Sequence, residues 1–132
     1  MRRTFVTLLL LCALAYAQAA VTVNTAGGWF ESTYVEWAPL SGYTDFNAYV
    51  RPAGGNYQLL DKQLLRSYGT YYRADALGLA AGNYQLKIVP VLNGNEVATD
   101  AAETATLTVT AHDRNGYAHF NYPAGVGGSV RQ

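Results

Sequence analysis

Apolar and polar residues alternate with a period of two in several short stretches between residues 20 and 110, a pattern that predicts β-strands. The strongest stretch spans residues 83–91, in which Tyr84, Leu86 and Ile88 lie on one face. The Asn93-Gly94 pair after it is typical of a tight reversal. No helical periodicity is sustained in this part of the chain. The alternation predicts an all-β domain of seven strands, at residues 20–24, 33–37, 46–51, 56–60, 71–77, 83–91 and 105–109.

The parity of each strand predicts which side chains form the core. Trp37 shares a face with Val35, and we expect it to be buried rather than to bind a ligand. The Gly27-Gly28 pair predicts a turn after the first strand. The parity of residues 71–77 is open, because Tyr72, Ala74 and Ala76 compete with Tyr71, Leu77 and Leu79 for the inside. The predicted core comprises Val35, Trp37, Phe46, Ala48, Val50, Leu79, Tyr84, Leu86, Ile88, Leu107 and Val109, with Ala105 also facing inward.

Residues 79–84 predict how the strands are connected. A leucine at 79, a turn glycine at Gly82 and Tyr84 at the start of a strand are the elements of a tyrosine corner. In this motif the ring packs inward and the hydroxyl bonds an upstream backbone group. We therefore expect a seven-stranded Greek-key β-sandwich of the fibronectin type III or immunoglobulin-like kind. Such a fold by itself names no reaction.

The first 19 residues have the composition of a signal peptide. Arg2 and Arg3 precede an apolar run at residues 5–15, and small residues at 15–19 offer two cleavage sites. This predicts a secreted or periplasmic protein with one sandwich domain at residues 20–111 and a junction tail at 112–132. A lipid anchor at Cys12 is disfavoured, because Leu11 stands where such a site needs a small residue. Cleavage removes Cys12, the one cysteine, so the mature chain cannot form a disulfide.

Charge and composition exclude several classes of function. The chain has nine Lys and Arg and nine Asp and Glu; without Arg2 and Arg3 the balance is seven against nine, a net charge near −2. This predicts no nucleic-acid partner, because a basic patch is lacking. We expect no cofactor, no metal site and no catalytic residues. His112, Asp113, Arg114 and His119 lie in a glycine-rich tail, which lacks the rigid frame that catalysis needs. Arg66, Arg73 and Asp75 predict a surface ion-pair cluster.

Aromatic residues are too numerous for so small a core. Exposed rings can stack on sugars, so they are candidates for carbohydrate binding if they line up on one face. The alternative, which we favour, is that they cover the ends of the sandwich or dock a neighbouring domain. The carbohydrate-binding candidates are Tyr43, Tyr49, Tyr57, Tyr68 and Tyr71, and Trp29, Phe30 and Tyr72 are further candidates for exposure.

Four segments resemble a known family. They are Gly27-Gly28-Trp29-Phe30-Glu31-Ser32, Val35-Glu36-Trp37, the run from Tyr71 to Gly82, and Ala111-His112-Asp113-Arg114-Asn115-Gly116-Tyr117. Together they look like the amino-terminal fibronectin type III-like domain of secreted bacterial pectate lyases. The resemblance implies a carboxy-terminal partner, a parallel β-helix that cleaves polygalacturonate by calcium-assisted β-elimination. The family continues for hundreds of residues after the position of Phe120. None of its catalytic positions exists in this chain, so none is carried over.

Three hypotheses of function are compatible with these features. The first is a non-catalytic accessory module, a spacer or docking domain of a pectate lyase. The chain is then either a fragment of the lyase, which we favour, or a stand-alone module. The second is a carbohydrate-binding module for pectin or another plant polysaccharide. The third, an adhesin-like extracellular structural domain, would predict tandem copies, and the chain holds one.

Overall fold

The computed structural model describes residues 20–111, which form ten β-strands and two 3-10 turns, with no α-helix in that range. The strands are β1 (Val23–Trp29), β2 (Ser32–Trp37), β3 (Asp45–Pro52), β4 (Gln58–Leu59), β5 (Leu65–Ser67), β6 (Tyr72–Leu77), β7 (Gly82–Leu92), β8 (Asn95–Glu96), β9 (Ala102–Glu103) and β10 (Leu107–Val109); the turns are η1 (Lys62–Leu64) and η2 (Ala98–Asp100).

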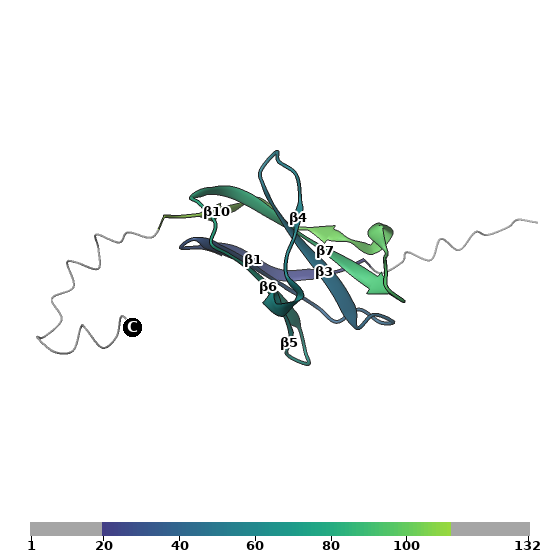
Figure 1. Ribbon diagram of the computed structural model, residues 1–132. Coiled ribbons are helices and arrows are strands. Elements are labelled where there is room, and N and C mark those ends of the chain that lie inside the picture. Colours follow the sequence, from purple (N-terminus) through teal and green to yellow (C-terminus); the bar gives the residue numbers. More distant parts are fainter. Residues whose placement is uncertain (1–19, 112–132) are drawn as a thin grey trace, which may run out of the picture.

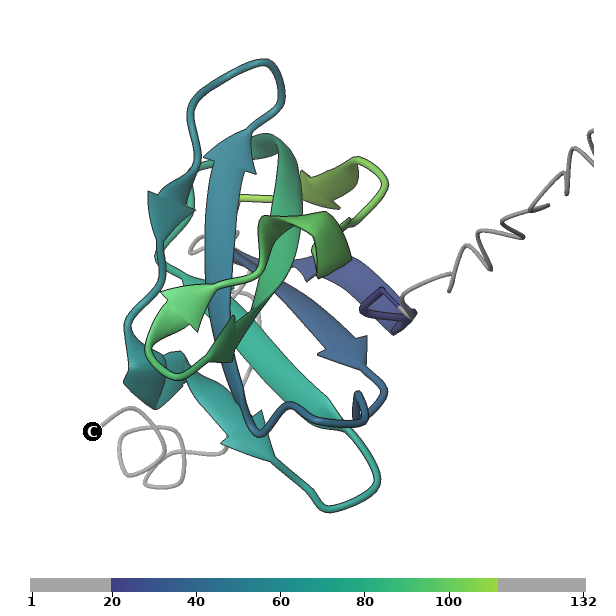
Figure 2. The ribbon, with the colours of Figure 1, turned by 90° about the vertical axis from the view of Figure 1, so that its right-hand side faces the viewer.

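Two antiparallel sheets pack face to face as a β-sandwich (Figure 1). One sheet has four strands in the order β1-β2-β6-β5. The other has six: its main order is β10-β7-β3-β4, and the short strands β8 and β9 pair with β7. Figure 2 shows the same two layers after a quarter turn. The prediction of an all-β sandwich is thus confirmed for the described residues.

The core between the sheets follows the predicted parity. Val35 and Trp37 of β2 are fully buried, and they face Phe46, Ala48 and Val50 of β3 from the opposite sheet. The parity of β6, which the sequence left open, places its small residues inward. The inward residues are Ala74, opposite Val35, and Ala76, opposite Thr33, and these small side chains leave room for the Trp37 indole beside them. Tyr72 stacks on Trp37, with ring centroids 5.7 Å apart.

Four sequence predictions need correction. The chain has ten strands between residues 20 and 111 rather than seven, because β5, β8 and β9 lack an apolar alternation. Ala105 is exposed, since β10 begins only at Leu107. Leu79 and Tyr84 are half-buried against the core rather than inside it. The fourth correction concerns the first strand.

The first strand runs straight through the glycine pair that was predicted to be a turn. Strand β1 continues to Trp29, and the reversal occurs at Phe30 and Glu31, where Glu31 has a φ of 52°. A Cβ atom on Gly28 would lie 1.7 Å from the carbonyl oxygen of Thr108. The glycine therefore permits a close approach of β1 to β10 rather than a turn.

The tyrosine corner is present. The Tyr84 hydroxyl donates to the carbonyl oxygen of Ala80 at 2.7 Å, four residues upstream, and Leu79 and the Tyr84 ring pack against the core. The predicted tight reversal is also confirmed. Asn93 and Gly94 both have positive φ angles, 50° and 80°, and they join β7 to β8.

The described chain begins and ends at opposite ends of the sandwich (Figure 1). At the amino-terminal end, the Val21 amide donates to the carbonyl oxygen of Asp100 at 2.9 Å. At the carboxy-terminal end, Thr110 donates to Trp29 and accepts from Glu31, at 3.2 and 3.0 Å. The β1 strand spans the distance between these ends, roughly 20 Å.

Candidate functional site

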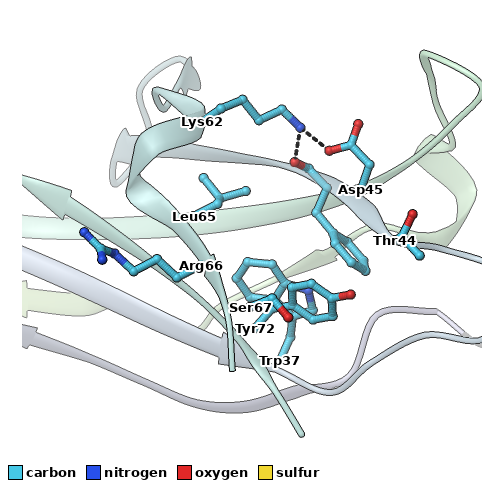
Figure 3. A pocket seen from close by; sticks show the side chains of 9 residues that line it. Trp37, Thr44, Asp45, Lys62, Leu65, Arg66, Ser67 and Tyr72 are labelled. Atoms are coloured by element: carbon cyan, nitrogen blue, oxygen red, sulfur yellow. Dashed lines mark hydrogen bonds and ion pairs between the residues drawn. The ribbon is translucent and has the colours of Figure 1, made fainter. Parts of the chain in front are cut away.

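A cavity at the amino-terminal end of the sandwich has aromatic walls and a charged rim (Figure 3). Its volume is about 230 Å³, and it is lined by the packed rings of Trp37, Phe46 and Tyr72. On the rim, Lys62 Nζ lies 2.5 Å from Asp45 Oδ1 and also donates to the carbonyl oxygen of Phe46. The aromatic walls of this cavity belong to the core, so they offer no free ring face for a ligand.

Two of the predicted tyrosines lie together on the outer face of the six-stranded sheet. Tyr49 on β3 is opposite Lys87 on β7, and its ring meets that of Tyr57 edge-on, with centroids 6.4 Å apart. The Lys87 ammonium lies 4.4 Å from the Tyr57 centroid and 4.9 Å from that of Tyr49, and the Arg51 guanidinium lies 4.4 Å from Tyr57. Cations thus occupy ring faces that a stacked sugar would need.

A carboxylate holds the hydroxyl group of Tyr49, whereas the buried Tyr57 hydroxyl has no hydrogen-bond partner among the described residues. Tyr49 donates to Glu96, which also accepts from Asn47 Nδ2 at 2.8 Å. The bond to Glu96 raises the pKa of Tyr49, and the bonds from Tyr49 and Asn47 lower the pKa of Glu96. Burial raises the pKa of Tyr57 to about 12, and the neighbouring Glu103 carboxylate adds to the shift. The pair is therefore locked into the sheet surface by its own neighbours.

Tyr43 anchors the amino-terminal end of the sandwich. Its ring packs against the core, and its hydroxyl donates to Asp100 Oδ2 at 2.9 Å. This hydrogen bond raises the pKa of Tyr43. The Asp100 side chain is buried, and the backbone of the same residue accepts from Val21. Tyr43 thus has a structural position: its hydrogen bond to Asp100 ties the β2–β3 loop to η2.

Tyr68 and Tyr71 form a third group, at the tip of the β5–β6 hairpin. Their rings stack with centroids 4.9 Å apart and an angle of 15°, and Tyr68 is 50% exposed. The five predicted tyrosines therefore lie in three separate places on the two sheets and their loops. They do not line up on one face.

A charged network crosses the outer face of the four-stranded sheet. The Arg73 guanidinium donates to both oxygens of Asp75, at 2.9 and 3.0 Å, and to Glu36 at 2.9 Å. It also lies over the Tyr34 ring, 4.4 Å from the centroid. The bonds to Asp75 and Glu36 raise the pKa of Arg73. The predicted pair of Arg73 and Asp75 is confirmed, with Glu36 as the further partner; Arg66 lines the cavity of Figure 3 instead.

Trp29 stands beside this network at the end of β1 and is 67% exposed. A cavity of about 410 Å³ lies between them, lined by Trp29, Ser32, Tyr34, Arg73 and Asp75. The sequence indicated that Trp29 would be exposed but gave no sign of the polar groups around it. The sequence alone does not specify the register between β1, β2 and β6. In the structure this register places Trp29 opposite Ser32, and Tyr34 opposite Asp75.

Several predictions fall on residues outside the described range. The signal peptide at residues 1–19 and the tail at 112–132, with His112, Asp113, Arg114 and His119, belong to this group. Among residues 20–111, no cluster of three or more potential metal-ligating side chains is found. The same residues include no helix long and apolar enough to cross a membrane.

Comparison with known proteins adds no assignment. No protein-family model matches the sequence, and a search of curated proteins finds no significant match.

Proposed function

We propose that the chain is a non-catalytic accessory module of a secreted pectate lyase, a rigid spacer that carries the segment after Ala111. The observation that supports this proposal best is the placement of the two chain ends. The chain enters at Val21 and leaves at Thr110, on opposite ends of the sandwich, and backbone hydrogen bonds clamp both points. A domain with this geometry presents the segment after Ala111 at the end of the sandwich opposite the mature amino terminus.

Exposed apolar residues at the carboxy-terminal end support a docking role. Leu77 is 62% exposed and Phe30 is 50% exposed, and the Phe30 backbone bridges to Thr110, where the chain leaves the sandwich. The amide of Leu79 also donates to the carbonyl oxygen of Glu31 at this end. A domain attached after Ala111 would meet these side chains first. Burying them would contribute roughly 25 cal/mol for each Å² removed from water.

The assignment to pectate lyases rests on the sequence resemblance. Its segments fall on the β1–β2 hairpin, on β2, and on β6 with the tyrosine corner, while the part of the junction motif after Ala111 lies outside the described residues. The genomic sequence downstream of the codon for Gln132 tests this assignment. A reading frame that encodes a β-helix would support it, and a frame that encodes an unrelated domain would contradict it.

The purified chain should not cleave polygalacturonate, because the family's calcium-binding aspartates and catalytic arginine have no counterpart in this sequence. The measurement is the ultraviolet absorbance of unsaturated products, with and without calcium. An increase that depends on calcium would show that the chain is catalytic and would refute this part of the proposal.

In the parent protein, Leu77→Asp should weaken the contact between the sandwich and its carboxy-terminal neighbour domain. A charge at a 62% exposed position costs the isolated sandwich little, but it would be buried at a docking interface. Calorimetry of the parent should therefore change from one joint unfolding transition to two. Leu92→Asp is the matched control, because Leu92 is 47% exposed beside the β7–β8 turn. Equal effects of the two substitutions would argue against docking at this end.

A further inference from the structure

We propose that the cavity beside Trp29, on the outer face of the four-stranded sheet, binds a neutral glycan. The first ground is the indole itself. Trp29 is 67% exposed, whereas Trp37 is fully buried, so Trp29 alone of the two tryptophans presents a wide flat surface to solvent. Pyranose rings carry apolar C–H groups on their faces, and an exposed aromatic ring is the surface on which such faces stack.

Polar groups converge on the same cavity and are already held in place. Arg73 donates through Nε and Nη2 to both carboxylate oxygens of Asp75, and through Nη1 to Glu36. Both Arg73 and Asp75 line the cavity, together with Ser32. These bonds use three of the five N–H groups of the guanidinium and leave lone pairs on the carboxylate oxygens, so donors and acceptors remain for the hydroxyls of a sugar. Because these side chains orient one another in the free protein, little side-chain freedom remains to be lost on binding.

The cavity is large enough for a short section of a glycan. The cavity volume of about 410 Å³ lies within the roughly 300–1,000 Å³ that is usual for small-molecule sites. Gly27 helps to shape it, since a Cβ atom there would lie 2.8 Å from Tyr34 Cε1. The absence of that atom lets the Tyr34 ring lie against β1, and the Arg73 guanidinium covers this ring. Trp29 is then the ring left for stacking.

Charge decides between neutral and anionic glycans. Of the charged residues, Arg73 and Asp75 line the cavity and cancel, and the Glu36 carboxylate that shares the Arg73 guanidinium brings the formal charge of the ion-pair network to −1. Arg66 on β5 is exposed and is the cross-strand partner of Arg73, but it lines the cavity of Figure 3 and makes no ion pair with the two carboxylates. The carboxylates of a uronic acid chain would be repelled by those of Glu36 and Asp75, whereas a neutral glycan would not be repelled. The site therefore prefers neutral glycans to polygalacturonate, and this goes beyond the spacer function proposed above.

The first measurement is quenching of tryptophan fluorescence by acrylamide in the full chain. Trp37 is inaccessible and serves as the internal control, so quenching reports on Trp29. We expect a quenchable component that disappears in the Trp29→Ala variant. If all emission resists quenching, the Trp29 indole is not accessible to a ligand, and the glycan proposal is overturned.

The second measurement is a titration with cellohexaose, mannohexaose, β-1,4-galactohexaose and hexagalacturonate, monitored by the indole N–H resonances and by protection from acrylamide. At least one neutral hexasaccharide should shift the Trp29 signal in a saturable way and bind more tightly than hexagalacturonate. Trp29→Ala should weaken this binding by about tenfold or more. Tyr68→Ala is the matched control, because Tyr68 is an exposed aromatic residue on a different hairpin, and we expect no change in affinity.

A third variant tests the role of charge separately from stacking. Asp75→Asn keeps the shape of the side chain and removes one negative charge, so it should narrow the preference for neutral over anionic hexasaccharides. The proposal is overturned if none of the three neutral probes gives saturable shifts, if hexagalacturonate binds as well as they do, or if binding survives the loss of the Trp29 ring. Unchanged melting temperatures for the variants ensure that a loss of binding is not a loss of folding.

Discussion

Replacing Trp37 by alanine should lower the free energy of unfolding by about 3 to 5 kcal/mol, which is comparable with the whole stability of many domains. The Trp37 indole is fully buried between the sheets. It stacks on Tyr72 at an angle of 12° and meets Phe46 edge-on at 5.4 Å. Ala74 and Ala76 on the neighbouring strand are too short to fill the space that its removal would leave. The measurement is urea unfolding monitored by circular dichroism.

Two further variants make this result specific. Trp29→Ala removes the same side chain from a position that is 67% exposed, and it should change stability by no more than about 0.5 kcal/mol. Trp37→Phe should cost less than Trp37→Ala, because it keeps most of the ring and removes a buried indole N–H that has no acceptor among the described residues. If Trp37→Ala instead melts within a few degrees of the unchanged protein, the indole does not support the core.

Strand parity could be predicted from sequence wherever large apolar residues alternate with polar ones. Val35 and Trp37 on β2, and Phe46 and Val50 on β3, are examples, because only one face of each strand carries enough apolar surface to form a core. The parity of β6 could not be predicted, since its inward residues are small. Their inward position depends on Trp37, a neighbour on β2 that stacks on Tyr72 at the start of the strand.

Some short strands were not predicted, because their own residues carry no apolar alternation. β5, β8 and β9 have two or three residues each and form by pairing with longer strands, β6 and β7. The backbone hydrogen bonds of the partner strand, rather than an apolar pattern, determine where they lie. A sequence pattern that relies on alternation has nothing to detect in such segments.

The candidate site was predictable only in part, for a related reason. Sequence indicated that Trp29 would be exposed, and that Arg73 and Asp75 would pair. It could not indicate that these residues lie together, because Trp29 is on β1 and the pair is on β6, with β2 between them. For Tyr49, the direction of the side chain was predictable but its neighbour was not. Tyr49 has outward parity as expected, but the cation beside it, Lys87, comes from a strand far along the chain.

Gly28→Ala should destabilise the domain by about 3 kcal/mol or more, because the added methyl group has nowhere to go. Its Cβ atom would lie 1.7 Å from the carbonyl oxygen of Thr108 and 2.5 Å from the carbonyl carbon. Both atoms belong to the backbone of β10, which is held by pairing with β7 and by the bonds of Thr110 at the end of the strand. Relief therefore requires β1 and β10 to separate. Amide hydrogen exchange should accelerate at Glu31 and Thr110, where the hydrogen bonds between these segments would open.

Gly27→Ala, one residue earlier, is the matched control. The added Cβ atom would lie 2.8 Å from Tyr34 Cε1, which is the far end of a side chain on the outer face of the sheet. Moving this ring disturbs its contact with the Arg73 guanidinium but no backbone, so the substitution should cost about 1 kcal/mol and leave the exchange at Thr110 unchanged. The two glycines then differ because one faces a fixed backbone and the other a movable ring. If both substitutions had equal effects, the glycine pair would act through chain flexibility, and the close approach of β1 to β10 would not explain its presence.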